Sequence, residues 1–186
     1  MAIKADQLLD AKGLACPMPI VKTKKAIKEL KPGQVIEVQA TDKGSTADIK
    51  AWSEKTGQQY LGTHEEDEVL YHYIRKSSDE EKQEKKHPQV VDNESIASLS
   101  ENSLILDVRE SAEYAFGHIP GAVSIPLGEL DIRVNELDKE KQIYVVCHTG
   151  NRSDMAAQKL SDQGFEKVYN VEPGMSQWKG ETVKEN

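Results

Sequence analysis

Cys147 stands where a reactive cysteine is expected. It directly follows the apolar run IYVV and begins the loop CHTGNRS, which ends at Ser153. A helical pattern through Met155, Ala156 and Leu160 comes next, so loop N–H groups and a helix N-terminus would surround the sulfur. Such donors favour the thiolate and lower the pKa of a cysteine from its free value of about 8.5. The pattern predicts a nucleophile rather than an inert buried thiol.

The rest of this loop predicts an anion cradle. Gly150 allows the backbone to bend, and Arg152 and His148 add positive or donor character. Two chemistries use a cradle of this kind, namely phosphate-ester hydrolysis through a cysteinyl phosphate and sulfur transfer through a cysteinyl persulfide. The phosphatase pattern has five residues between cysteine and arginine, whereas four stand here, which favours the smaller persulfide. The residues expected to hold the anion are His148, Thr149, Gly150, Asn151, Arg152 and Ser153.

Cys16, in the stretch ACPMPI, is the second of the two cysteines in the chain. A helix that starts here would lower its pKa, and Lys22 is one or two turns away. Pro17 and Pro19 would hold the thiol at a rigid edge. From position alone, a buried cap residue and a reactive thiol are equally open. Neither cysteine has CxxC or zinc-like spacing and no glycine-rich phosphate motif is present, so we expect free thiols, no metal and no cofactor.

The length of 186 residues suits two small domains. The segment SSDEEKQEKKHP has no apolar residue and separates two periodic regions. We therefore expect a first domain over residues 1–76, a charged linker over 77–87 and a second domain over 88–186. A solvated helix is the alternative for the linker.

The first domain is predicted to have the order βαβαββ. A strand near Leu8 precedes a helix over 19–30, and an alternating strand over 34–41 is expected to be half-buried. A second helix starts at Ser45 with Asp48 three residues later, as in a capping box, and stops at Gly57. Two strands around an acidic turn complete a two-layer sandwich of helices on a sheet.

The second domain is predicted to be a doubly wound, parallel α/β sheet. Short apolar runs at 90–91, 104–108, 122–126, 143–146 and 167–171 alternate with helical segments. Sheets of this type bind ligands beyond the carboxyl ends of their strands, and Cys147 stands at such an end.

Charge and hydropathy exclude several functions. The net charge is -8, and residues 88–186 carry nine Lys and Arg against seventeen Asp and Glu. An acidic surface argues against nucleic acid as a partner. No apolar run is long enough to span a membrane, and the first residues lack a secretory signal, so a cytoplasmic location is expected. Lys22, Lys25 and Lys28 would give the first helix one basic side.

From about Gln89 to Lys179 the chain resembles a rhodanese domain. The resemblance rests on DVRE, EYAFGHIPGAVSIP, IYVVCHTGNRS and NVEPGMSQW in that order. It implies that Cys147 takes sulfane sulfur from a small donor such as thiosulfate, a persulfide or a polysulfide, and that the loop amides hold the persulfide anion. One departure is Pro173, where the family usually has glycine.

Three further residues of the rhodanese motifs are expected to be structural. Asp107 and Arg109 would organise the end of a strand through ion pairs and hydrogen bonds. His118, beside a proline, would be a structural or rim residue rather than a catalytic base.

The stretch LLDAKGLACPMPIVKTKKAIKEL resembles the TusA/SirA family of small sulfur carriers, and the likeness continues to about Lys76. The resemblance implies that Cys16 carries sulfur as a persulfide between enzymes. The SirA-like relation also leaves open a regulatory interaction role.

Together these features predict a sulfurtransferase in which Cys147 is loaded and relays sulfur to or from Cys16. The expected partners are a small sulfane-sulfur donor and a thiol-bearing acceptor protein. The alternative is a carrier or sensor without turnover, which delivers its persulfide to a separate protein.

Overall fold

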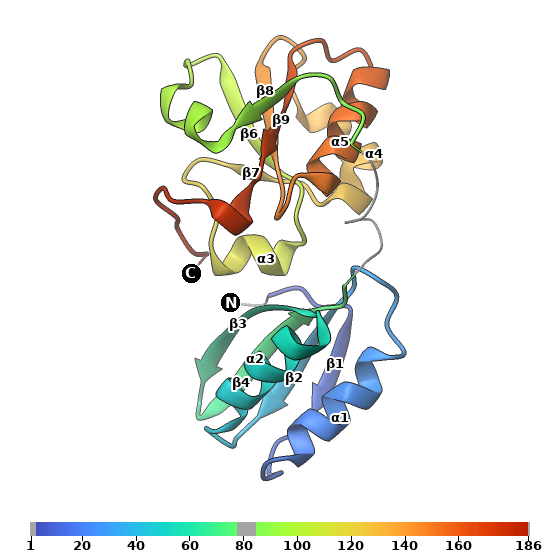
Figure 1. Cartoon of the computed structure of the whole chain (residues 1–186), viewed down its shortest axis with the longest axis vertical. Coiled ribbons are helices and arrows are strands. Elements are labelled where there is room, and N and C mark those ends of the chain that lie inside the picture. The colour runs from blue at the N-terminus through green and yellow to red at the C-terminus, as the bar shows by residue number, and fades with distance from the viewer. Residues whose placement is uncertain (1–2, 78–84, 186) are drawn as a thin grey trace. The chain divides into compact units, whose positions relative to one another are not determined.

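The computed structural model describes residues 3–77 and 85–185 of the chain. The chain divides into two compact units, Met1–Asp79 and Glu80–Asn186, and each is described by itself (Figure 1). The sequence predicts a linker over 77–87, of which residues 78–84 lie outside the described residues. Within the described ranges, no helix is long and apolar enough to cross a membrane.

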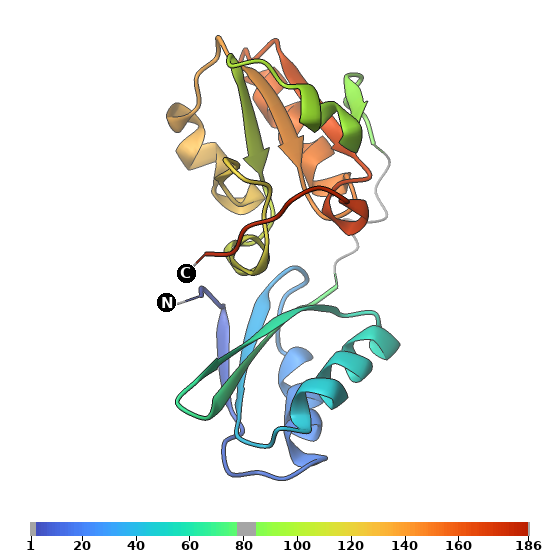
Figure 2. The same cartoon turned by 90° about the vertical axis from the view of Figure 1, so that its left-hand side faces the viewer.

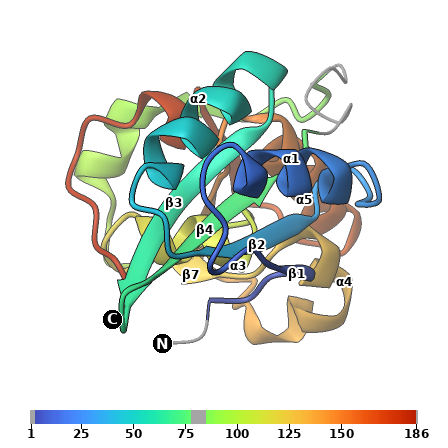
Figure 3. The ribbon, with the colours of Figure 1, turned by 90° about the horizontal axis from the view of Figure 1, so that it is seen from below.

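The first unit has the predicted βαβαββ order. Its elements are β1 (Gln7–Asp10), α1 (Met18–Ile27), β2 (Val35–Ala40), α2 (Ser45–Thr56), β3 (Gln59–Glu66) and β4 (Val69–Arg75). The sheet order is β1-β2-β4-β3, with β1 parallel to β2 and the other pairs antiparallel. Helices α1 and α2 lie side by side over one face of this sheet (Figure 3). The two-layer prediction is confirmed.

Helix α1 forms because its apolar positions recur on one side. Thr23 and Ile27 are buried, whereas Lys22, Lys25 and Lys28 are exposed, as the periodicity predicts. The buried side packs on a core that α2 and the strands complete. The main members of that core are Ala11, Ala26, Ile27, Leu30, Ile36, Val38, Ile49 and Ile74.

Strand β2 is more buried than its alternating sequence predicts. It lies between β1 and β4, and all its residues except Gln39 are buried. Glu37 is 8% exposed, and the Tyr73 hydroxyl donates a hydrogen bond of 2.6 Å to its Oε2. A carboxylate tolerates burial when it accepts such a bond. The polar position therefore faces another polar side chain of the sheet, and the half-buried prediction is wrong.

The start of α2 also differs from the capping box that the sequence predicts. No side-chain capping bond forms at the helix start. The Ser45 hydroxyl donates instead to the Asp42 carbonyl at 2.6 Å, and His72 Nε2 lies 2.9 Å from the same oxygen. Asp48 is thereby left available to another partner, the thiol described below. The predicted stop is confirmed, because Gly57 caps the helix with a φ of 75°.

The second unit is a five-stranded parallel sheet, as predicted. Its strands are β5 (Val90–Asp92), β6 (Ser103–Asp107), β7 (Val123–Ser124), β8 (Gln142–Val146) and β9 (Val168–Glu172). They lie in the order β5-β9-β8-β6-β7. The α-helices are α3 (Ser111–Phe116), α4 (Leu130–Arg133) and α5 (Asn151–Asp162), and short 3-10 helices include η2 (Asn93–Ser98) and η5 (Met175–Gln177).

Apolar residues cover both faces of this sheet. One core joins the sheet to α4 and α5, which Figure 1 shows on the same side. A smaller cluster on the other face contains Ile119, Val146 and Val171, with Ile96 of η2 and Trp178 packed against it. Figure 2 shows the C-terminal segment running from η5 past α3. Burial on both faces explains why the strands read as short apolar runs without alternation.

Residues 85–87, which the sequence assigns to the linker, are held by the second unit. The Asp154 carboxylate of α5 accepts hydrogen bonds from the backbone N–H of Lys86 at 3.1 Å and of His87 at 2.8 Å. His87 is buried, and its Nε2 lies 2.8 Å from the Val168 carbonyl oxygen. The described end of the predicted linker therefore contacts the helix that follows Cys147. The sequence does not predict this contact, because the segment has no apolar residue and the hydrogen bonds that hold it are polar.

Candidate functional site: two thiols in opposite surroundings

Cys147 lies where the sequence predicts, directly after β8 and just before α5. Strand β8 is central in the sheet, between β6 and β9. The side chain is 1% exposed. The Gly150 backbone N–H donates a hydrogen bond of 3.1 Å to Sγ, and Ser153 Oγ lies 3.2 Å from it. The loop therefore turns donors toward the sulfur, as an anion cradle requires.

A polar network behind the loop keeps these donors in place. The Ser153 hydroxyl donates to Asn170 Oδ1 at 2.5 Å, and Asn170 Nδ2 donates to the Gly150 carbonyl at 3.1 Å. Ser153 and Asn170 are both fully buried. Because a hydroxyl has one hydrogen, Ser153 accepts from Cys147 when the sulfur is a thiol and can turn its hydrogen toward a thiolate. The network thus adapts to either state of the sulfur.

The Arg152 guanidinium interacts electrostatically with Cys147 and is also paired with a carboxylate. Its guanidinium forms a bidentate ion pair with Glu113 of α3, with N–O distances of 2.6 and 3.0 Å. Both residues are 3% exposed. Burial disfavours the charged form, yet the attraction of Glu113 holds the pKa of Arg152 above its usual value. The arginine ties the first turn of α5 to α3, so its electrostatic effect on Cys147 is shared with a carboxylate.

The remaining loop residues are less enclosed. His148, Thr149 and Asn151 are half-buried, and Asn151 is the first residue of α5. The His148 carbonyl accepts a hydrogen bond from the Ser176 N–H at 2.8 Å, so its carbonyl turns away from the cradle. That these residues hold a persulfide anion stays a prediction.

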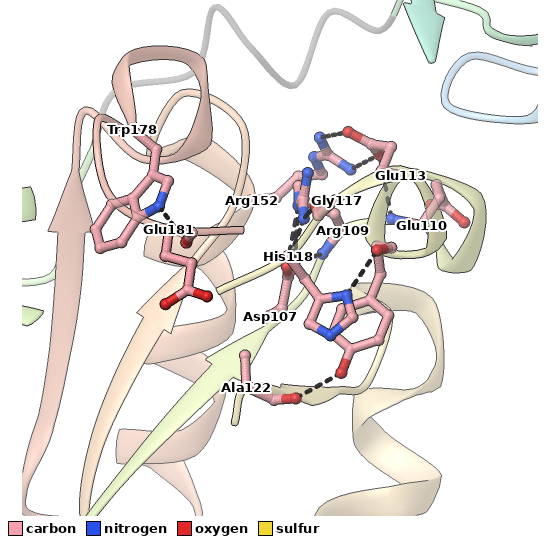
Figure 4. A network of polar contacts seen from close by, with 11 residues as sticks. Asp107, Arg109, Glu110, Glu113, Gly117, His118, Ala122, Arg152, Trp178 and Glu181 are labelled. Atoms are coloured by element: carbon pink, nitrogen blue, oxygen red, sulfur yellow. Dashed lines mark hydrogen bonds and ion pairs between the residues drawn. The ribbon is translucent and has the colours of Figure 1, made fainter. Parts of the chain in front are cut away.

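Asp107 and Arg109 organise the end of β6, as predicted. The Arg109 guanidinium donates to Asp107 Oδ2 at 2.7 Å and to the Gly117 carbonyl at 2.8 Å (Figure 4). His118 is structural, also as predicted: its ring stacks on Tyr114 at 3.6 Å, and its Nδ1 lies 2.9 Å from the Tyr114 carbonyl oxygen. Figure 4 shows this network beside the Arg152–Glu113 pair.

The turn that departs from the rhodanese pattern packs directly beneath Cys147. The Glu172–Pro173 peptide bond is cis, and Gly174 follows with a φ of 85°. A Cβ at Gly174 would lie 2.5 Å from the Cys147 carbonyl oxygen, closer than atoms can approach. The Asn93 side chain accepts from the Gly174 N–H and donates to its carbonyl, each at 3.0 Å. Position 174 must therefore be glycine, whatever residue stands at position 173.

Cys16 lies in a different environment. It is exposed, directly before Pro17, the N-cap of α1. Its thiol donates a hydrogen bond of 2.6 Å to Asp48 Oδ2, and its backbone N–H donates to Asp42 Oδ2 at 2.9 Å. The exposed edge that the prolines predict is confirmed.

The lowered pKa that the sequence predicts for Cys16 is wrong because of these carboxylates. The sequence predicts that the helix N-terminus and Lys22 lower its pKa. The hydrogen bond to Asp48, with some burial and the negative charges of Asp48 and Asp42, instead raises the pKa of Cys16. Local sequence shows the helix start and the lysine, but the two aspartates come from a distant segment.

Several site residues escape reasoning from sequence alone. Glu113 and Asn170 contact the Cys147 loop from segments far along the chain, and Asn93 contacts Gly174 of the turn that packs against this loop. Asp42 and Asp48 do the same for Cys16. The sequence singles out Asp48 only as part of a helix cap, because a carboxylate in a first helical turn is usually explained that way.

The chain is a two-domain α/β protein in which each domain has one free cysteine just before a helix. The contrast between the cysteines is chemical. Cys147 is buried and its sulfur accepts a hydrogen bond from a backbone N–H, whereas Cys16 is exposed and its thiol donates to a carboxylate.

Comparison with known proteins identifies both domains. Residues 7–76 match the family model described as sulfurtransferase TusA, and residues 92–181 match the rhodanese-like domain. The chain is 53% identical over 183 residues to "Putative sulfur carrier protein YrkF" of Bacillus subtilis (strain 168), covering 97% of this chain and 99% of that protein. "Sulfur carrier protein TusA" of Allochromatium vinosum is 43% identical over 72 residues, 39% of this chain and 95% of that protein. The crystal structure of a rhodanese-related protein from Thermoplasma volcanium, 31% identical, covers 52% of this chain and 99% of its own, with a TM-score of 0.49.

The chain belongs to the family of proteins that join a TusA domain to a rhodanese-like domain. Both resemblances seen in the sequence are thereby confirmed. The chemistry of this family is sulfur transfer, and the rhodanese-like domain carries sulfurtransferase activity. Such chemistry requires a sulfur donor and a thiol acceptor.

Proposed function

We propose that Cys147 is loaded with sulfane sulfur from a small donor and passes it to Cys16. In the loading step the Cys147 thiolate attacks the outer sulfur of thiosulfate, the sulfur–sulfur bond of thiosulfate breaks, and sulfite leaves with its electron pair. In the second step Cys16 attacks the outer sulfur of the Cys147 persulfide, and the Cys147 thiolate leaves. Both steps are exchanges at divalent sulfur of the thiol–disulfide type and need no cofactor.

The observation that carries this proposal is the donor set on Cys147 Sγ. The Gly150 N–H at 3.1 Å and the Ser153 hydroxyl at 3.2 Å would stabilise the thiolate that attacks in the first step and leaves in the second. A stabilised leaving group favours transfer away from Cys147. These contacts support the direction from Cys147 to Cys16.

The environment of Cys16 supports its role as the receiving thiol. It is exposed, whereas Cys147 is 1% exposed. An exposed persulfide can be handed to a thiol of another protein. Since the sequence has two cysteines, a relay within the chain can run only between Cys147 and Cys16.

The test is intact mass spectrometry after brief exposure to thiosulfate, with peptide mapping of the added sulfur. The wild type is compared with Cys147→Ser and Cys16→Ser. We expect Cys16 to gain one sulfur in the wild type and none in Cys147→Ser, while Cys147 still loads in Cys16→Ser. Independent loading of both cysteines would refute the relay. Dilution separates transfer within one chain, whose rate is independent of concentration, from transfer between chains.

Turnover separates the proposed enzyme from a carrier that is loaded once. We expect thiosulfate with a thiophilic acceptor such as cyanide to give continuous sulfite release, which is abolished in Cys147→Ser and retained in Cys16→Ser. A single burst of sulfite equal to the protein concentration would favour the carrier or sensor.

A further inference from the structure

Two carboxylates face the exposed thiol of the first domain. The Cys16 S–H donates to Asp48 Oδ2 at 2.6 Å, a short distance for a bond from sulfur. Asp42 Oδ2 lies on the backbone N–H of the same residue at 2.9 Å. An exposed cysteine needs no partner because water can solvate it, so this contact calls for a chemical rather than a packing explanation.

The fold fixes Asp48 and Asp42 near the start of α2. Asp48 lies in the first turn of α2, where the helix dipole stabilises a negative charge. Asp42 is fixed in the loop before that helix, where its Oδ1 accepts a hydrogen bond of 3.0 Å from the Gly44 N–H. Both carboxylates therefore present acceptors to Cys16 from one side of the unit. The lysine expected to oppose them, Lys22, acts electrostatically on Asp10.

We propose that Asp48 is a specificity-determining residue that holds Cys16 as a protonated thiol and so slows its reaction with small electrophiles in solution. Reaction with the persulfide carried by the same chain is then the favoured route. The selectivity rests on the relay proposed above, whereas the control of the thiol by Asp48 does not.

The reaction rate of a thiol depends on two opposing quantities, the fraction present as thiolate and the nucleophilicity of that thiolate. Each unit by which a thiol pKa rises above the ambient pH lowers the thiolate fraction about tenfold and raises the nucleophilicity of the thiolate about threefold, a net loss of about threefold. The contacts with Asp48 and Asp42 raise the pKa of Cys16, so this loss applies to Cys16. It applies equally to peroxides, disulfides and free polysulfides.

Selectivity arises because transfer within the chain is fast enough for the loading of Cys147 to limit the internal route, and Asp48 does not act on that loading. A persulfide on the same chain reaches Cys16 at an effective concentration on the order of millimolar. A free electrophile at micromolar concentration has no such advantage. The carboxylate therefore slows the competing reactions of Cys16 without slowing the supply of persulfide from Cys147.

The internal step balances without any added reagent. The bond between Cys147 Sγ and the outer sulfur breaks, and the bond between Cys16 Sγ and the outer sulfur forms. The thiol proton of Cys16 passes to solvent before the sulfur attacks as a thiolate. Cys147 departs as a thiolate, and the number of sulfur–sulfur bonds is unchanged.

The first experiment measures Cys16 without any sulfur transfer. In the full-length Cys147→Ser chain, the rate of alkylation by iodoacetamide is followed from pH 6 to pH 10, alone and with Asp48→Asn or Glu54→Gln. Glu54 is an exposed carboxylate of the same helix and serves as the matched loss of one charge. We expect Asp48→Asn to move the midpoint to lower pH and to accelerate alkylation at pH 7 by about threefold for each unit moved. Glu54→Gln should change neither.

Asp48→Glu provides the control for folding. It keeps the charge, so alkylation should stay slow if the carboxylate is responsible, whereas general damage near α2 would accelerate it. An unchanged or higher midpoint in Asp48→Asn would overturn the proposal. So would equal acceleration in Glu54→Gln. Neither result depends on whether the relay exists.

The second experiment measures selectivity in chains that retain Cys147. Thiosulfate and glutathione disulfide are supplied together, and mass spectrometry gives the ratio of persulfide to glutathione mixed disulfide on Cys16. We expect Asp48→Asn to lower this ratio at least threefold relative to Glu54→Gln. An unchanged ratio together with faster alkylation would refute the selectivity and leave the effect on the thiol intact. Persulfide that is absent from Cys16 in every chain would instead refute the relay.

Discussion

The buried Arg152–Glu113 pair makes a sharp prediction about stability. Glu113→Gln keeps the shape of the side chain and removes its charge, so the guanidinium of Arg152, a residue that is 3% exposed, loses the anion that its two nitrogens contact at 2.6 and 3.0 Å. Breaking such a pair costs about 3–5 kcal/mol, because an uncompensated charge stays buried. For a unit of this size, 3 kcal/mol corresponds to a fall of roughly 12 °C or more in the unfolding midpoint.

The chain supplies a matched control. Arg133 and Glu136 also form a two-point pair, with N–O distances of 2.9 and 3.1 Å, but Glu136 is half-exposed. Exposed pairs contribute little, since water replaces the lost partner. Glu136→Gln should therefore leave the midpoint nearly unchanged.

Differential scanning calorimetry of the full chain is the assay. We expect Glu113→Gln to lower the transition of the second unit and to leave that of the first in place. Glu113→Asp, which keeps the charge at a shorter reach, should recover part of the loss. If Glu113→Gln and Glu136→Gln lower the midpoint equally, burial does not govern the strength of this pair and the reasoning fails.

Three further predictions concern the sites and the first core. Gly174→Ala should reduce thiosulfate loading of Cys147 at least tenfold, because its Cβ would meet the Cys147 carbonyl oxygen at 2.5 Å. Gly128→Ala is the control and should load normally, because the added carbon meets nothing within 4 Å. Equal loading rates in the two variants would contradict the packing argument. Ser153→Ala should slow loading by up to about tenfold, the low end of the contribution of a hydrogen bond to a charged group, and unchanged sulfite release would show that this hydroxyl does not support the thiolate. Burial lowers the pKa of His72 to about 4 from an ordinary 6.5, so the unfolded chain binds this proton first and stability falls as the pH falls. Between pH 6.5 and pH 5 the first unit should lose about 2 kcal/mol in denaturant titrations, and the loss should disappear in His72→Gln.

Features of this protein that depend on neighbouring residues are predicted from the sequence. Periodicity places the helices and strands, and the stretches ACPMPI and CHTGNRS locate both thiols, because a helix start and a loop after a strand are local features. The same two stretches carry motifs of the two families to which the domains belong. The exposure of Cys16 and the donor from Gly150 to Cys147 follow from local backbone as well.

The surroundings of each sulfur come from segments that only the folded chain brings together. Asp48 reaches Cys16 across 32 positions, and Glu113 reaches Arg152 across 39. For Cys16, local sequence suggests the wrong electrostatics, because it predicts a thiol activated by a helix N-terminus. For Arg152, it shows the positive charge but not the buried carboxylate that pairs with it. Hydrogen bonds and charges act over a few ångströms of space, and packing brings together segments whose separation along the chain carries no information about that distance. The reactivity of a cysteine is therefore set by the fold, even where its position can be read from the sequence.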